Sequence, residues 1–338
     1  MLTENGITDI PIRTACKKMS LETKLSLLGD IDITYPRMNR IFSAIQRSRY
    51  MSKFHNKANN ILVYGKTGVG KTYICEKIVN QNPRVEGKQN EDPEIPVLMV
   101  RVENFATVKS LVFKFLVTLG DPVADKGPEY VQSNRFNQLV KACNVELIII
   151  DEVHHFLDMY KNSEKSIKKL KPLRPLINWV KVKSDETRIP FVLVGIEEAI
   201  AILEKEEEGQ LSRRFKNRKH LEAFKFDDKP NQNEFYTLLC FIDEKLPFQK
   251  DSAFLDGNLP AKIFYATDGI IDHVLELITY ASEIALLNGD DRVISDHLAL
   301  SYNETLEALM KKQNPFSKGK YYVILQKQTE KLQFATHT

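Results

Sequence analysis

The sequence predicts an α/β fold, in which a parallel β-sheet carries helices on both faces and is followed by a small all-helical domain. Between about residues 60 and 195, short apolar runs alternate with helical patterns, and several runs are apolar throughout, as buried parallel strands are. After about residue 228, apolar residues recur only with helical period. We therefore divide the chain into an N-terminal extension (1–34), an α/β core (35–228), a helical domain (229–312) and a basic tail (313–338).

The composition is that of a globular chain, with 43% apolar and 28% charged residues among 338. Its formal net charge is only +3, so any contact with nucleic acid has to come from local basic patches. The cysteines form no CxxC pair, and no histidine lies at zinc-ligand spacing from them, so we expect reduced thiols in a cytoplasmic protein. No secretory signal and no run of 18 apolar residues is present, so no membrane association is expected.

The core begins with an amphipathic helix in "YPRMNRIFSAIQRSRYMSKFH", whose apolar side holds Met38, Ile41 and Ile45, with Tyr50 as a further candidate. Four apolar runs then predict strands: "NILVYG" (60–65), "IPVLMVRV" (95–102), "VELIIID" (145–151) and "IPFVLVG" (189–195). The segments that follow the first three, and that precede the fourth, predict helices: "KTYICEKIVNQ", "TVKSLVFKFLVTLGDP", "RFNQLVKAC" and "PLINWVKVKS". A helix and a loop are predicted in "EEAIAILEKEEEGQLSRRF", and we expect no further strand.

The helical domain contains four runs of helical period: "NEFYTLLCFIDEKL", "LPAKIFYAT", "IIDHVLELITYASEIALLNG" and "SDHLALSYNETLEALMKK". In the tail, the short apolar island "YYVIL" leaves two interpretations open. The tail is either a flexible hook that binds a partner or a disordered end without a role.

A phosphate-binding loop is predicted at "GKTGVGKT" (65–72), which matches G-x-x-x-x-G-K-[S/T] and lies between a predicted strand and a predicted helix. Glycines let backbone N–H groups curl around phosphates, and the start of the following helix adds partial positive charge. Lys71 can reach the β- and γ-phosphates, and the Thr72 hydroxyl can bind Mg²⁺. The residues expected to contact the nucleotide are Gly65, Lys66, Thr67, Gly68, Val69, Gly70, Lys71, Thr72 and Tyr73.

Two carboxylates follow the run "LIII", at the end of the third predicted strand. A P-loop NTPase holds Mg²⁺ with an acidic residue at the end of a neighbouring strand, and Asp151 occupies that place. Glu152 comes next and can orient and polarise the attacking water. The strand "IPVLMVRV" lies between the two motifs. An extra strand there is typical of the branch that contains AAA+ proteins, helicases and RecA-like motors, so the fold class is a P-loop NTPase αβα sandwich.

His154 and His155 complete "DEVHH" and support weaker interpretations. Metal-binding histidines on a helix are spaced i, i+4, whereas adjacent histidines are expected to point to different faces. "DEVH" also spells a helicase signature, but a second RecA-like half is not predicted after residue 228. We expect one histidine to pack near the nucleotide and the other to lie at the surface.

The chain resembles the TniB/TnsC group of AAA+ transposition ATPases, relatives of the Mu phage B protein. The resemblance spans about residues 33–230 and rests on "YPRMNRIFSAI", "NNILVYGKTGVGKT", "LGDP", "LIIIDEVHHF", "IPFVLVGIEEA" and "QLSRRF". The phosphate-loop and acidic motifs are generic to AAA+ proteins. "LGDP" and the spacing from "RMNRI" to "NNILVYG" are more specific, and the resemblance fades in the tail.

The resemblance implies an ATPase, dependent on Mg²⁺, that forms homo-oligomeric rings or filaments on duplex DNA when ATP is bound. It implies partners of two kinds, a TniQ-like target-selector protein and transposase subunits, in a bacterial cytoplasm. An arginine of the neighbouring subunit is expected to reach the γ-phosphate, and in "QLSRRF" Arg214 is the first candidate and Arg213 the second. Lys109 and Lys126 fall where the family places DNA-facing residues, although both also fit solvated surface lysines.

Two departures from AAA+ patterns affect the expected rate. The place of the polar sensor after "FVLVG" holds Ile196, with Glu197 next, and the place of a sensor arginine in the helical domain holds Asp272. We therefore expect slow hydrolysis, with ATP acting mainly as an assembly switch. Two other functions stay open: a different AAA+ machine of the initiator or clamp-loader kind, and a nucleotide-gated protein adaptor that does not bind DNA.

Overall fold

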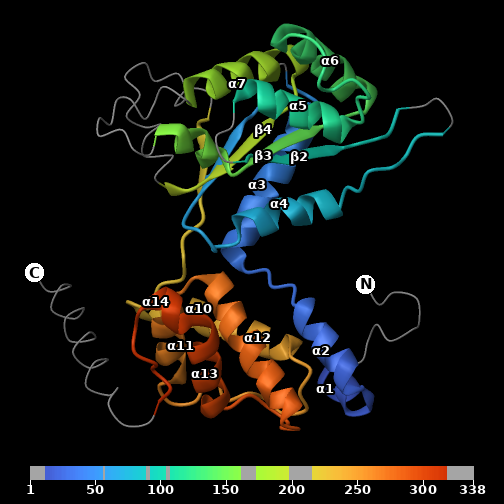
Figure 1. The fold of residues 1–338 in the computed structure, drawn as a ribbon. Helices are drawn as coiled ribbons and strands as arrows, with labels where there is room; N and C mark the ends of the chain where they lie inside the picture. Colours follow the sequence, from blue (N-terminus) through green and yellow to red (C-terminus); the bar gives the residue numbers. More distant parts are fainter. Residues whose placement is uncertain are drawn as a thin grey trace, which may run out of the picture. The chain divides into compact units, whose positions relative to one another are not determined.

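The computed structural model describes residues 12–55, 58–88, 92–103, 107–160, 173–197 and 215–317, and Figure 1 draws the fold. The chain forms two compact units. One is Pro36–Glu222, and the other joins the described residues of Met1–Tyr35 with those of Ala223–Thr338. Each unit is a folded body of its own, and the predicted phosphate loop and acidic motif both belong to the first.

A five-stranded parallel sheet forms the centre of the unit Pro36–Glu222. Its order is β2-β3-β4-β1-β5, and this arrangement confirms the predicted α/β class. Four of the strands are the predicted apolar runs, and β5 is the strand that the sequence analysis missed. The strands are β1 (Ile61–Tyr64), β2 (Val97–Arg101), β3 (Leu147–Asp151), β4 (Phe191–Gly195) and β5 (Asn217–His220).

The strand between the phosphate-loop strand and the acidic strand is a different one from the strand that comes between them in the chain. In the sheet, β4 pairs with both β1 and β3, whereas β2 lies at the edge beyond β3. The expectation that Val97–Arg101 supplies the extra strand is therefore wrong, although a strand does lie between β1 and β3. Sequence order does not reveal this because crossover connections let β4 join the sheet after β3.

Helices cover both faces of the sheet, with α5, α6 and α7 on one side and α3 and α4 on the other (Figure 1). The apolar residues of β3 and β4 are buried throughout, as expected for strands covered on both faces. A short 3₁₀ segment, Val153–Tyr160, follows β3 directly. The helices are α3 (Pro36–Ser52), α4 (Lys71–Asn80), α5 (Val108–Leu119), α6 (Glu129–Ala142) and α7 (Leu173–Thr187).

An aromatic cluster fills the core under α5, α6 and α7. Phe115, Phe136, Trp179 and Phe191 lie with ring centroids 5.2–6.0 Å apart, and all four are buried. Each large side chain of this kind contributes about 1.5–3 kcal/mol when it is buried. This packing fixes the helices on the sheet and therefore fixes the strand ends that carry the polar residues of the site.

Helix α3 buries one face, as its apolar spacing predicts. Met38, Ile41 and Ile45 are buried, but Tyr50 is 61% exposed, so its placement on the apolar face is wrong. The ring of Tyr50 pairs with that of Phe54 instead, with centroids 5.2 Å apart. The last turn of the helix is held by charge, because Arg49 and Lys53 both contact the carboxylate of Glu146, next to β3.

Glu146→Gln is expected to lower the free energy of unfolding by about 1–2 kcal/mol at neutral pH, because it removes charge-assisted hydrogen bonds. Burial raises the pKa of Glu146, but the hydrogen bonds from Lys53 and Arg49 outweigh it and lower that pKa. A lowered folded-state pKa gives stability above the unfolded pKa of about 4.3 and loses it as pH falls through the folded value. Urea unfolding should therefore separate the variant from wild type at neutral pH but not near pH 3, and an equal difference at both pH values would contradict this account.

The second unit is helical, and the four helical runs predicted for residues 229–312 all form helix there. Residues of the N-terminal extension fold with it: α2 packs on α12, and Arg13 pairs with Asp243 at 2.7 Å and with Asp251 at 2.6 Å. Across the described ranges, none of the helices combines the length and apolar character needed to cross a membrane. The unit contains α1 (Ile12–Ala15), α2 (Leu21–Gly29), α10 (Lys229–Lys245), α11 (Leu259–Thr267), α12 (Ile271–Leu287), α13 (Ser295–Ser301), a π-helical turn (Tyr302–Leu306) and α14 (Glu307–Met310).

Candidate nucleotide-binding site

The phosphate loop connects the end of β1 to the start of α4, as predicted. Gly65 has no room for a side chain, because a Cβ there would lie 2.1 Å from the carbonyl oxygen of Leu221, just after β5. Gly70 caps α4 with φ at 93°, a left-handed conformation that favours glycine. These two glycines let the loop turn tightly between the sheet and the helix, with the helix N-terminus facing into it.

Lys71, at the start of α4, is buried, and its ammonium group lies inside the loop. Nζ donates to the carbonyl oxygens of Gly65 at 2.8 Å and of Lys66 at 2.7 Å. A buried cation surrounded by neutral carbonyls is costly compared with one that faces an anion. The loop is therefore built around a positive charge that a phosphate group would complement.

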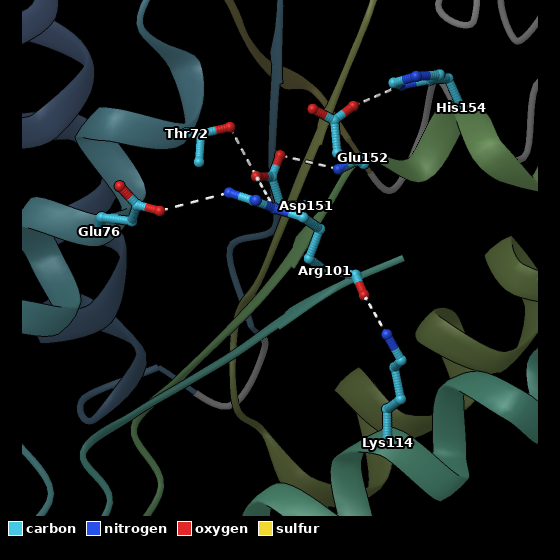
Figure 2. Close-up of polar contacts among 7 residues, drawn as sticks. All are labelled: Thr72, Glu76, Arg101, Lys114, Asp151, Glu152 and His154. Carbon is cyan, nitrogen blue, oxygen red and sulfur yellow. Dashed lines mark hydrogen bonds and ion pairs between the residues drawn. The ribbon is translucent and has the colours of Figure 1, made fainter. Parts of the chain in front are cut away.

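Thr72 and Asp151 meet across the sheet, although β4 separates their strands. The Thr72 hydroxyl donates to Asp151 Oδ2 at 2.8 Å, and the carboxylate of Asp151 is inaccessible to solvent (Figure 2). Burial raises the pKa of Asp151, while the hydrogen bond from Thr72 acts in the opposite direction. A hydroxyl and a buried carboxylate are the hard oxygen donors that Mg²⁺ prefers, so this pair fits the predicted ion.

Arg101 is a site residue that the sequence analysis did not single out. It ends β2 and lies opposite Asp151 in the parallel register, with its Nε 3.7 Å from Asp151 Oδ2 and a terminal nitrogen 3.4 Å from Glu76 Oε1 (Figure 2). The side chain is 56% exposed, so the attraction is weakened by solvent. Both strands end in charged residues at the same edge of a parallel sheet, and that pattern was the available signal for Arg101.

Glu152 turns away from its neighbour because its backbone is in the left-handed region, with φ at 59°. This conformation is uncommon for glutamate and is found where surrounding structure enforces it. Its backbone N–H donates to Asp151 Oδ1 at 2.8 Å, while its own carboxylate faces His154 (Figure 2). The adjacent His154 ring, more than burial, sets the pKa of Glu152, which is lowered, so the group is ionised at neutral pH and can accept a proton from water.

His154 and His155 lie on the same side of the chain, so the expectation that their rings diverge is wrong. Their ring centroids are 4.3 Å apart, and His154 Nδ1 is 3.0 Å from Glu152 Oε2. The reason is local backbone geometry, because both residues belong to the 3₁₀ segment rather than to a strand or an α-helix. Both are half-buried, so neither matches the expected surface position.

The residues after β4 form a second polar group beside the phosphate-loop strand. Glu197 pairs with His220 at 2.7 Å, and the His220 ring stacks on Tyr64, the last residue of β1, with centroids 4.7 Å apart. Glu197 is thus engaged by the end of β5, and Ile196 occupies the place of the expected sensor. Asp272, at the place of the second sensor, is an exposed residue in the first turn of α12.

Several predicted site residues lie apart from this cluster or outside the described ranges. Arg213 and Arg214 lie outside the described residues, as do the basic segment 161–172 and the tail beyond residue 317. Lys109, in the first turn of α5, and Lys126, between α5 and α6, are both exposed. The structure therefore brings together Lys71, Thr72, Asp151 and Glu152, and places the two lysines on the surface.

A model of the family described as the bacterial TniB protein matches residues 28–226, which is more than half of the chain. The chain belongs to the TniB family. The matched region contains the whole sheet and every residue of the cluster around Lys71. This result confirms the family that the sequence motifs resemble. No curated protein matches the TniB chain over its sequence.

Solved structures with the same fold include three archaeal proteins. Each resembles this TniB chain at low identity, and the chain spans 66–71% of their lengths. They are the Aeropyrum pernix ORC2 protein (17% identical, 78% of this chain and 66% of that chain covered, TM-score 0.51), the Aeropyrum pernix ORC1 protein in complex with DNA (15%, 83% and 69%, 0.54) and Cdc6p from Pyrobaculum aerophilum (11%, 83% and 71%, 0.56). The chain thus has the AAA+ P-loop fold with a helical C-terminal region, and family and fold together support an AAA+ ATPase.

Proposed function

We propose that this TniB family member is an ATP-dependent, DNA-binding regulator of DNA transposition that assembles on duplex DNA. In this role it links a TniQ-like target-selector protein to transposase subunits. The observation that carries the proposal is the meeting of Lys71, Thr72, Asp151 and Glu152 at the strand ends of a TniB-family chain. This arrangement supports nucleotide binding and hydrolysis, and the family supplies the context of transposition.

Each residue of the cluster has a role that follows from its position. Lys71 exchanges the loop carbonyls for the β- and γ-phosphates, and the loop N–H groups hold the remaining phosphate oxygens. Thr72 and Asp151 hold Mg²⁺, which neutralises phosphate charge. Glu152 is ionised and accepts a proton from the attacking water. Arg214 or Arg213 of a neighbouring subunit stabilises the charge that develops on the γ-phosphate.

Hydrolysis is proposed to be slow, with ATP acting as the assembly switch. Ile196 cannot hydrogen-bond the γ-phosphate through its side chain, and Glu197 beside it is paired with His220. Asp272 would repel phosphate, where an arginine would attract it. The shape of the subunit is therefore less tightly linked to the cleavage step than to the presence of the nucleotide.

Electron microscopy with ATPγS, with and without duplex DNA, tests the proposed function. Rings or filaments that need both ATPγS and DNA would support it. Assemblies that need nucleotide but are indifferent to DNA would favour a protein adaptor. Closed assemblies that bind DNA only at a defined sequence would favour an initiator, a reading that the DNA-bound Aeropyrum ORC1 structure keeps open.

Lys109→Ala and Lys126→Ala are each expected to reduce the salt dependence of duplex binding. Both side chains are exposed, so each phosphate contact that they make releases counterions. The slope of log K against log salt should fall by about 1 for each true contact, with little change in sequence preference. Fluorescence anisotropy over a salt series measures it, with Lys141→Ala on α6 as the matched exposed control. An unchanged slope in both variants would exclude these lysines as DNA contacts.

A further inference from the structure

Three potential metal ligands of this chain gather at one point beside the phosphate loop. A carboxylate oxygen of Glu152 and ring nitrogens of His154 and His155 all lie within 4.8 Å of one another. All three residues are half-buried and follow one another within four positions of the chain. Within the described ranges, this is the one group of three such side chains with this spacing.

The spacing of these atoms is close to that of a metal site. Ligands of a tetrahedral zinc ion, about 2.0–2.1 Å from the metal, lie about 3.3 Å from one another. Glu152 Oε2 and His154 Nδ1 are already 3.0 Å apart. The His155 ring lies 4.3 Å from the His154 ring between centroids, so rotation of its side chain is enough to bring its nitrogen into place.

Two details favour a bound cation at this point. His154 Nδ1 is shielded from solvent and makes no hydrogen bond among the described residues, although it faces the carboxylate oxygen of Glu152. The left-handed backbone of Glu152 directs its carboxylate to the histidines and away from Thr72 and Asp151. Two separate oxygen and nitrogen donor sets therefore lie on either side of the Asp151–Glu152 bond.

The two donor sets differ in the metal that they select. The oxygens of Thr72 and Asp151 suit Mg²⁺, whereas imidazole nitrogens favour zinc, nickel or cobalt over Mg²⁺. Three protein ligands leave a fourth tetrahedral position for water. A transition metal can therefore occupy the histidine side while Mg²⁺ is present in large excess.

We propose that Glu152, His154 and His155 form an inhibitory site for a transition metal of the zinc class, distinct from the Mg²⁺ site. Metal bound there removes the lone pair of Glu152 that would accept the proton of the attacking water. Hydrolysis stops while Lys71, Thr72 and Asp151 still bind ATP, so the metal holds the ATP-bound state. The metal site stands by itself, whereas its effect on hydrolysis rests on the proposed ATPase function.

Cobalt titration of the nucleotide-free full-length chain tests the site without any reference to activity. Co²⁺ is the probe because its visible absorption reports tetrahedral coordination. We expect one Co²⁺ ion per chain, bound in the presence of excess Mg²⁺ and displaced by Zn²⁺. His154→Ala, His155→Ala and Glu152→Gln should each weaken binding at least tenfold, because each removes a ligand. His55→Ala, at an exposed histidine after α3, should bind as wild type does.

Absence of tetrahedral Co²⁺ absorption in wild type, or equal affinity in the His154→Ala and His155→Ala variants, would overturn the proposal. Three independent ligand variants keep the test decisive if one of them fails to fold. A second readout is hydrolysis in excess Mg²⁺: micromolar Zn²⁺ should stop it in wild type, a chelator should restore it, and the residual hydrolysis of His155→Ala should be insensitive to Zn²⁺. If the chain does not hydrolyse ATP at all, the cobalt result still decides whether the metal site exists.

Discussion

Lys71→Ala is expected to abolish nucleotide binding at physiological concentrations. The ammonium group makes two hydrogen bonds inside the loop, to the carbonyls of Gly65 and Lys66, and it is the buried charge that a phosphate would meet. Loss of two charge-assisted bonds of about 1.5–3 kcal/mol each raises Kd by a factor on the order of 100 or more. Titration of a fluorescent ATP analogue measures the affinity.

The matched control for this variant is Lys141→Ala, which removes an exposed lysine from α6 and should bind ATP as wild type does. Thermal unfolding of both variants separates lost binding from lost folding. If folded Lys71→Ala protein binds ATP within about threefold of wild type, Lys71 does not hold the phosphates, and the assignment of this loop as the nucleotide site is wrong.

Glu152→Gln is expected to retain ATP binding and to lose hydrolysis. The amide has the shape of the carboxylate but cannot accept a proton, and loss of a general base costs about 10²-fold or more. Lys71, Thr72 and Asp151 are untouched, so the affinity for ATP should change little. Single-turnover hydrolysis of radiolabelled ATP, with protein in excess, measures the cleavage step even when the wild-type rate is low.

Under the proposed function, the same variant should also accumulate the ATP-bound assembly. Glu129→Gln, in the exposed first turn of α6, is the matched control and should hydrolyse ATP at the wild-type rate. Wild-type hydrolysis by Glu152→Gln protein, or faster disassembly with ATP, would show that another group activates the water.

The sequence was sufficient to predict the α/β core because its strands are apolar runs. Residues 147–150 are buried on both faces, so they read as a continuous hydrophobic segment. β5 has the sequence Asn-Arg-Lys-His and its side chains are half-buried or exposed, so no apolar pattern marks it. It is a strand because β1 supplies a partner for its backbone, which is a tertiary effect that periodicity does not contain.

The site was predictable where a motif fixes the backbone, and less so where partners come from elsewhere. The phosphate loop and Asp151 are defined by their positions after apolar strands. Arg101 becomes part of the site only through the pairing of β2 with β3, which places it opposite Asp151. The close approach of His154 and His155 depends on the 3₁₀ segment and on the left-handed Glu152, neither of which residue spacing reveals.

A structure of the chain assembled with ATPγS on duplex DNA tests the central claim most directly. The account predicts nucleotide between subunits, with Lys71 on the phosphates, Thr72 and Asp151 at the metal, and Arg214 or Arg213 of the neighbouring subunit at the γ-phosphate. It also predicts DNA backbone against a surface that includes Lys109 or Lys126. An assembly that holds no nucleotide at its subunit interfaces, or a nucleotide-bound chain that does not engage duplex DNA, would contradict the account.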